Sequence, residues 1–190
     1  APVRVARFEE RDFVDRDGNW SLPAFAARIA SSRVWGVGGV VWNTLELGLC
    51  TALSATFLAL CFALLVARTR LPGRRLFGVL AVLPMITPPF VIGLALIMLF
   101  GRSGALNAVL EQWFGIPPTR WIYGLPGVWL AQTLALTPVA YLVLVGVVDG
   151  ISPAFEEAAQ TLRASRSRTF ATVTLPLMAP GLVNAFLIVF

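Results

Sequence analysis

The sequence has no histidine and no lysine, and it has only two cysteines among its 190 residues. Because histidine is the commonest metal ligand and titrates near neutral pH, its absence excludes a histidine-based metal site and histidine-centred acid–base catalysis. Cys50 and Cys61 lie eleven residues apart in one apolar run, which in a helix would separate them by about 16 Å along the axis. They cannot form a disulfide with each other, and we expect both cysteines to act as small apolar packing residues.

Charged residues are also scarce, at 13% of the chain, whereas hydrophobic residues make up 57% and the mean hydropathy is +0.79. Soluble domains contain about 45 to 50% apolar residues. The composition therefore predicts an integral membrane protein. The net charge of +5 could indicate nucleic acid, but the arginines lie in the gaps between apolar runs, as membrane topology requires. We expect no nucleic-acid partner.

Apolar segments predict four membrane spans, at about residues 43–67, 76–100, 123–148 and 177–190. The first three are long enough to cross a hydrocarbon core of about 30 Å as helices. The second is interrupted by PMITPP (84–89), where prolines without N–H groups should break the helix. The fourth runs to the last residue, and the chain begins with Ala1 rather than methionine. We therefore expect a piece of a longer protein, cut at both ends.

The distribution of arginine predicts the orientation. Four arginines and no acid lie in residues 67–75, after the first span, and three more lie in residues 163–168, after the third. Both segments fall on one side of the membrane, which the positive-inside rule makes cytoplasmic. Residues 101–122 and a charged lead-in segment, residues 1–42, then face outward. An outward lead-in implies a further span before it.

The charged segment after the third span predicts a short cytoplasmic helix. Ser152 followed by Pro153 is typical of an N-cap and a first helical residue. Glu156 and Glu157 follow in the first turns, where the positive end of the helix dipole favours acids. A plain solvated loop helix is one interpretation of this segment.

A family resemblance supports a more specific interpretation. The stretch EEAAQTLRASRSRTFATVTLPLMAPG (156–181) resembles the EAA loop of permease subunits in ATP-binding-cassette (ABC) importers. That motif runs Glu-Ala-Ala, three residues, Gly, nine residues, a branched apolar residue, any residue, then Leu-Pro. The matching positions here are Glu157, Ala158, Ala159, Val173, Leu175 and Pro176.

One position departs from the motif, because Arg163 stands where the family has glycine. Glycine there lets the chain leave the first helix of the loop in a left-handed turn. Two outcomes are open: Arg163 adopts that conformation at a cost of about 1 to 2 kcal/mol, or the helix continues through it.

The resemblance covers about residue 43 to the end. Within the family, the sequence is most similar to the subgroup that serves ferric iron, which has relatives for thiamine, polyamines, sulfate and 2-aminoethylphosphonate. It implies an all-helical type I importer permease in a bacterial inner membrane, with residues 152–176 as a cytoplasmic coupling helix and loop. It implies no catalytic site and no bound cofactor, since a partner ATPase dimer uses the ATP and magnesium. It also implies a periplasmic binding protein and a second permease half, which is identical, separate or fused. The residues it assigns to ATPase coupling are Glu157, Ala158, Ala159, Arg163 and Pro176.

Polar residues inside the third span are candidates for lining a solute pathway. Thr133, Thr137 and Tyr141 recur every four residues and so share a helix face, with Gln132 beside them. Threonine also commonly bonds to its own helix backbone, so helix packing is the alternative. No carboxylate lies deep in a span, so we expect no metal site in the membrane.

Two other functions compete. A membrane enzyme should show clustered acids, histidine or a Ser/Lys pair, and outside the loop the spans offer only the isolated acids Glu46 and Asp149. A degenerate or regulatory permease-like protein, uncoupled from ATP hydrolysis, is the second alternative, and Arg163 is the residue that favours it.

Overall fold

The computed structural model describes residue 26 and residues 29–69, 72–161 and 163–190. Most of the predicted lead-in segment, and the side chains of Glu156 and Arg166, therefore lie outside what is described. All regular structure in the described residues is helical. The chain divides into two compact units, residues 1–49 and residues 50–190. The first contains α2 (Ser32–Trp35) and the start of α3 (Val40–Arg68), and its Trp35 Nε1 donates to the Ile29 carbonyl at 2.8 Å.

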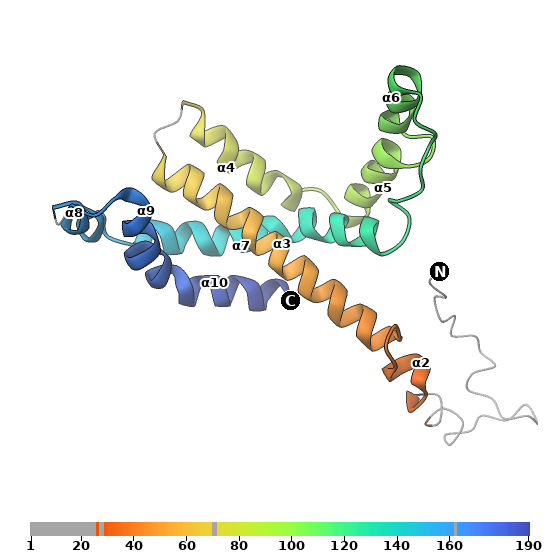
Figure 1. Ribbon diagram of the computed structural model, residues 1–190, viewed down its shortest axis with the longest axis horizontal. Coiled ribbons are helices and arrows are strands. Elements are labelled where there is room, and N and C mark those ends of the chain that lie inside the picture. The colour runs from red at the N-terminus through yellow and green to blue at the C-terminus, as the bar shows by residue number, and fades with distance from the viewer. Residues whose placement is uncertain (1–25, 27–28, 70–71, 162) are drawn as a thin grey trace, which may run out of the picture. The chain divides into compact units, whose positions relative to one another are not determined.

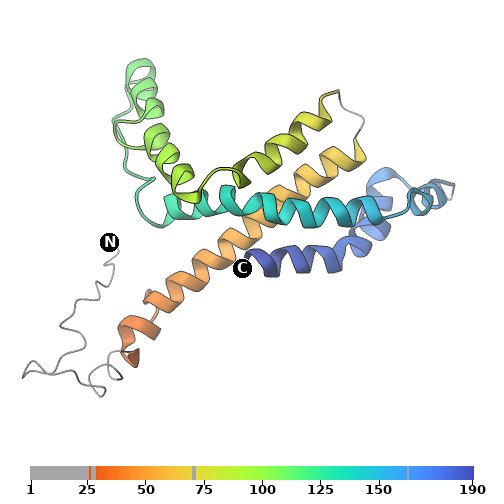
Figure 2. The same cartoon turned by 180° about the vertical axis from the view of Figure 1, so that it is seen from behind.

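The second unit contains the rest of α3 and every later element. α7 is its central helix: it packs against α4, η2, α5 and α10, and both views show it between α4 and α10 (Figures 1 and 2). The later elements are α4 (Arg74–Val82), the 3₁₀ turn η2 (Leu83–Met85), α5 (Pro89–Phe100), α6 (Ala105–Phe114), α7 (Leu125–Gly150), α8 (Pro153–Thr161), α9 (Arg166–Thr169), the π-helical turn η3 (Phe170–Thr174) and α10 (Leu175–Val189).

Four helical stretches of the described chain are long and apolar enough to cross a membrane, at Ser32–Arg68, Pro89–Phe114, Leu125–Gly150 and Ser167–Val189. Their number confirms the predicted membrane bundle. The helix that leads into the fourth span starts at Arg166, well before the apolar run at 177, because it continues through Pro176 and Pro180. The loop that follows α8 and the fourth span are thus joined by continuous helix.

The predicted proline break is present. η2 ends at Met85 and α5 begins at Pro89, which occupies the first helical position, where no N–H is needed. Pro138 has the opposite outcome, since it lies buried inside α7 without ending that helix. A single proline removes one backbone bond, whereas the pair Pro88 and Pro89 removes two successive donors.

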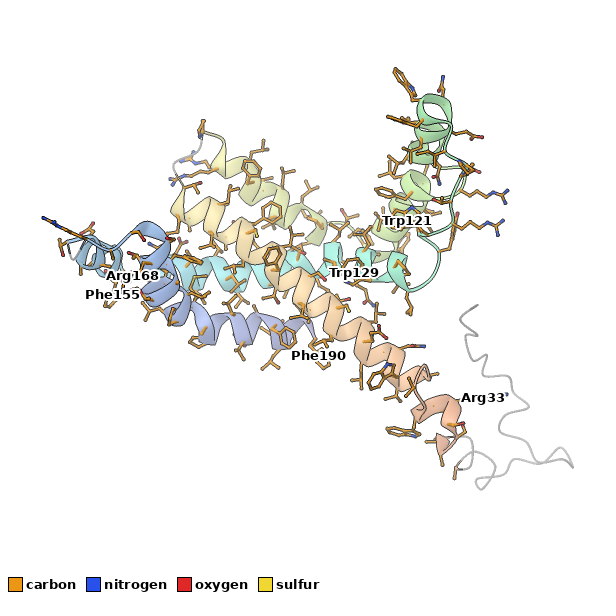
Figure 3. The ribbon with its side chains drawn as sticks, viewed as in Figure 1. Arg33, Trp121, Trp129, Phe155, Arg168 and Phe190 are labelled. Carbon is orange, nitrogen blue, oxygen red and sulfur yellow. The ribbon has the colours of Figure 1, made fainter. Side chains whose placement is uncertain are left out.

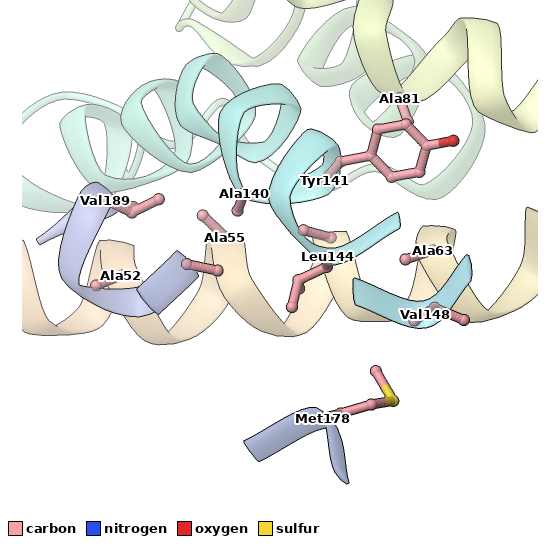
Figure 4. Packing of buried hydrophobic residues seen from close by; sticks show 12 residues of the cluster. Ala52, Ala55, Ala63, Ala81, Ala140, Tyr141, Leu144, Val148, Met178 and Val189 are labelled. Atoms are coloured by element: carbon pink, nitrogen blue, oxygen red, sulfur yellow. The ribbon is translucent and has the colours of Figure 1, made fainter. Parts of the chain in front are cut away.

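Small side chains let the central helices approach closely. Ala52, Ala55, Ala59 and Ala63 recur every three or four residues on α3, and each is fully buried. They belong to one buried cluster with residues of α7 and α10 (Figure 4). Lipid is as apolar as a leucine side chain, so close van der Waals packing is what stabilises such contacts in a membrane. Members from α7 and α10 include Ala140, Tyr141, Leu144, Val148, Met178 and Ala185.

The contact between α7 and α10 depends on a glycine. A Cβ atom added to Gly181 of α10 would lie 2.5 Å from Cγ2 of Val147 on α7, too close for any real contact. A Cβ added to Gly146, the neighbouring glycine on α7, would meet nothing within 4 Å. The two glycines therefore differ in the space around them, although both lie in helices.

We predict that Gly181→Ala destabilises the protein, because overpacking costs about 1 to 3 kcal/mol. Gly146→Ala is the matched control and should be neutral or slightly stabilising, since alanine is more favourable than glycine inside a helix by about 1 kcal/mol. Adding Val147→Ala should rescue Gly181→Ala. The measurement is the monodisperse fraction left after heating in detergent. Equal stability of the two alanine variants would contradict the close α7–α10 contact.

Candidate functional site

α8 begins as the sequence predicts. The backbone N–H of Ala154 donates to Oγ of Ser152 at 3.3 Å, and the N–H of Phe155 donates to the Ser152 carbonyl at 3.2 Å. Pro153 is the first residue of the helix. Ser152 therefore caps α8, and the helix starts at a fixed residue just beyond the end of α7.

α8 ends in a left-handed turn at Arg163. Arg163 has φ 58°, and among the described residues it is the only non-glycine with a positive φ. The N–H of Ala164 bonds back to the Ala159 carbonyl at 3.1 Å. This is the long bond of a Schellman motif, in which the left-handed residue normally is glycine. Of the two possibilities left open by the sequence, the structure has the first: arginine makes the turn.

The second half of the loop is a helix with one widened turn. Ser165 Oγ accepts from the N–H of Arg168 at 3.3 Å, which caps α9. In η3 the N–H of Leu175 bonds to the Phe170 carbonyl, five residues back. Pro176 follows directly, and its ring would clash with the carbonyl four residues back in a regular helix. The π turn therefore accommodates Pro176 without breaking the helix.

The loop leaves one helix largely uncovered. α8 packs against α9 and η3, yet Glu157 and Ala158 are exposed and Ala159 is half-buried. Phe155, a large apolar side chain on α8, is 55% exposed (Figure 3). Arg163 and Pro176 are exposed as well. The sequence motif does not mark Phe155, and its exposure in the fold is what identifies it as a candidate contact residue.

The polar residues of α7 divide into two kinds. Thr133, Thr137 and Tyr141 are all buried, and Thr137 Oγ1 donates to the Thr133 carbonyl at 2.6 Å, within its own helix. The Thr133 hydroxyl has no hydrogen-bond partner within the described part of the chain. Gln132 is exposed, and its Oε1 accepts from Thr51 Oγ1 of α3 at 3.2 Å. The structure thus buries the predicted three-residue face and leaves the neighbouring amide accessible.

The described residues contain no cluster of three or more histidine, cysteine or acidic side chains that could hold a metal ion. Cys50 and Cys61 are both free thiols.

Comparison with known proteins assigns the chain to a family. Residues 56–190 match the family described as binding-protein-dependent transport system inner membrane component. The chain belongs to this family. Its permeases are parts of ABC importers, as the EAA loop resemblance implied. Family membership and the four candidate spans place this permease chain in the inner membrane.

Several curated permeases are similar in sequence. The ferric transport system permease protein FbpB of Actinobacillus pleuropneumoniae is 40% identical over 92% of this chain, which covers 25% of that protein. The molybdenum transport system permease protein ModB of Escherichia coli K12 is 34% identical over 68% of the chain and 55% of its own length. The sulfate permease CysW of Synechocystis is 33% identical over 70% of the chain and 47% of its own length. The chain therefore spans about a quarter of the ferric permeases it matches.

A solved structure has the same fold. A crystal structure of a bacterial alginate ABC transporter, in complex with an alginate-bound periplasmic protein, matches with a TM-score of 0.74 at 19% identity. The match covers 89% of this chain and 59% of that one. At this identity the match establishes the helical permease fold and nothing about the solute.

The left-handed turn gives a local test. Arg163→Gly should keep or strengthen the protection of α8 amides against hydrogen exchange, because glycine adopts a positive φ without the cost of about 1 to 2 kcal/mol paid by other residues. Arg163→Val should weaken that protection, because a β-branched residue is a genuine outlier at positive φ. Arg168→Val makes the same chemical change in α9 and should leave α8 protected. Equal exchange in the two valine variants would show that no left-handed turn exists at Arg163.

Proposed function

We propose that this chain is part of the membrane pathway of an ABC importer and that α8 is its coupling helix to a separate cytoplasmic ATPase. The observation that carries the proposal is the Glu157-Ala158-Ala159 triplet, of which Glu157 and Ala158 are exposed, on a helix that is capped at Ser152 and closed by the left-handed turn at Arg163. In this proposal the chain has no catalytic site of its own. The ATPase dimer binds ATP and magnesium, and this chain binds no cofactor.

The exposed surface of α8 suits a protein partner. Glu157 offers a carboxylate that an arginine or backbone N–H of the ATPase can pair with, and Ala158 lets the partner approach closely. Phe155 supplies an apolar anchor, the type of side chain that dominates binding energy at interfaces. A solvated loop helix has no need of an exposed phenylalanine, so this residue favours docking over the plain loop interpretation.

The path from α8 to the membrane core is continuous. α8 packs on α9 and η3, η3 runs directly into α10, and α10 packs along α7. A displacement of α8 by ATPase closure would therefore move α10 and α7 together. In this proposal Arg163 holds the turn between the two halves of the loop, and Pro176 marks the junction with the fourth span.

The further partners follow from the family. A periplasmic binding protein delivers the solute, consistent with the complex seen for the alginate transporter. A second permease half completes the pathway, because one such bundle forms only one side of it. That half is an identical chain, a separate chain or a fused segment of the same protein.

We propose ferric iron as the solute, because two ferric permeases are 40% and 38% identical over 92% of this chain. Molybdate and sulfate permeases are also related and are the first alternatives. Gln132 is the foremost pathway candidate, since its side chain is exposed and its Oε1 accepts from Thr51 Oγ1 of α3 at 3.2 Å. Thr137 and Tyr141 then support that wall from within the bundle.

A permease-like protein without ATPase coupling is the competing function. Its supporting feature was arginine at the glycine position of the motif. Because Arg163 adopts the conformation that glycine would provide, this feature no longer favours an impaired loop. ATPase capture by the full-length protein distinguishes the two functions directly.

The coupling proposal predicts that Glu157→Arg abolishes capture of the ATPase. Breaking one side of a partly buried charged contact costs about 2 to 5 kcal/mol, which weakens binding at least about 25-fold. The measurement is co-purification of the full-length protein with candidate ATPase subunits in mild detergent. Glu111→Arg is the matched control, because Glu111 is an exposed acid on α6, which this proposal places on the outward side of the membrane. Failure of the wild type to retain any ATPase would contradict coupling, and equal retention by Glu157→Arg would exclude Glu157 as the contact.

The solute proposal predicts that a ferric-loaded binding protein stimulates ATP hydrolysis by the reconstituted complex severalfold, whereas binding proteins loaded with molybdate or sulfate do not. Gln132→Leu should lower ferric uptake and leave ATPase capture unchanged, because it removes a polar group from the pathway and not from the loop. Stimulation only by the molybdate-loaded or sulfate-loaded binding protein would show that the solute is that anion and not iron. Unchanged ferric uptake in Gln132→Leu would show that Gln132 does not line the pathway.

A further inference from the structure

The joint between α7 and α8 is bridged by a charged side chain from another helix. Arg68 is the last residue of α3, and its Nη2 donates to the Val148 carbonyl at 3.1 Å and to the Ile151 carbonyl at 3.2 Å. Val148 lies in the last turn of α7, and Ile151 immediately precedes Ser152, the cap of α8. One nitrogen atom thus holds both sides of the joint.

The chemistry of the joint explains why an arginine stands there. The last carbonyls of a helix have no partner within it, and they carry the negative end of the helix dipole. A guanidinium at that point satisfies the carbonyls and places a positive charge where the dipole favours one. Because Ile151 has extended backbone angles, φ −79° and ψ 116°, the backbone ladder of α7 does not itself continue into α8. The main chain makes one bond across this end, from the Ile151 N–H to the Val148 carbonyl at 3.3 Å. Arg68 adds a second connection, from another helix, to the carbonyls of the same two residues.

We infer that Arg68 is a positioning residue for coupling: it fixes the direction in which α8 leaves α7 and ties that joint to α3. This inference rests on the proposed function of α8. With the joint held, a displacement of α8 is transmitted to both α7 and α3. With the joint free, the chain bends between Ile151 and Ser152, and the displacement is lost in local rotation.

The inference separates Arg68 from the other arginines of its segment. Arg74 and Arg75 are exposed. Their role in the proposal is to orient the chain in the membrane, as part of the excess of positive charge on the cytoplasmic side. Arg68 is half-buried and bonded to carbonyls of a different helix. Substituting Arg75 therefore removes the same charge from the same short segment without touching the joint, which makes it the matched control.

The first experiment measures the joint without requiring transport. In a Cys50→Ala background, spin labels on the native Cys61 of α3 and on Thr161→Cys of α8, both exposed positions, report the distance between the two helices by pulsed electron resonance. The wild type and Arg75→Gln should give one narrow distribution, and Arg68→Gln a broad one. Arg68→Lys should be intermediate, since it keeps the charge and loses the planar guanidinium. Equal widths for Arg68→Gln and the wild type would overturn the inference, whatever the function of α8.

The second experiment measures coupling in the full-length complex with its ATPase and loaded binding protein, reconstituted in liposomes. Arg68→Gln should retain the ATPase and its hydrolysis, while solute imported per ATP falls about tenfold to a hundredfold, the equilibrium factor of one hydrogen bond to a charged group. Arg68→Lys should recover part of the loss. Unchanged import per ATP in Arg68→Gln would overturn the inference. A wild-type complex that captures no ATPase would instead contradict the proposed function, and the spin-label distances would still decide the geometry of the joint.

Discussion

Backbone carbonyls at the ends of helices need donors from outside the regular ladder, and the segment between α7 and α10 of this permease depends on that requirement. At the end of α7 the Val148 carbonyl accepts from the Ile151 N–H and from the Arg68 guanidinium, which also donates to the Ile151 carbonyl. At the end of α8 the donor is the N–H of Ala164, which can reach back only because Arg163 is left-handed. Before Pro176 the ladder widens into a π turn, so that the N–H of Leu175 still has an acceptor. Each solution also sets the direction of the next helix, so the bonds that satisfy the backbone also shape the loop between α7 and α10.

The sequence was informative wherever a local rule acts alone. Four spans follow from apolar length, the break before Pro89 from two adjacent prolines, and the start of α8 from Ser152 and Pro153. The sequence left the end of α8 undecided, because a penalty of about 1 to 2 kcal/mol for a left-handed residue is small enough for the rest of the loop to outweigh. Family assignment needed the spacing of a motif, since composition alone indicates only a membrane protein.

Contacts between distant segments were beyond the sequence. In the sequence, Arg68 is only one positive charge among several. Its role becomes visible when the fold brings the end of α3 beside the end of α7, where Arg68 bonds to Val148, eighty residues later in the chain. The same holds for the threonines of α7: their spacing shows that they share a face, but only packing shows that Thr137 bonds to its own helix and that Gln132 remains accessible. Exposure of Phe155 likewise depends on which neighbours the fold leaves off α8.

The π turn also determines an angular relation. Each residue of an α-helix advances the chain by about 100° around the axis. The extra residue in the π turn Phe170–Thr174 therefore rotates α9, which precedes the turn, relative to the face of α10 on which Gly181 meets Val147. Removing or adding one residue between the triplet at 157–159 and the Leu175-Pro176 pair would turn these two faces out of phase. The length of the motif thus fixes how the two faces are rotated relative to each other. Two permeases could exchange this loop only if both have the same number of residues between the triplet and the Leu-Pro pair.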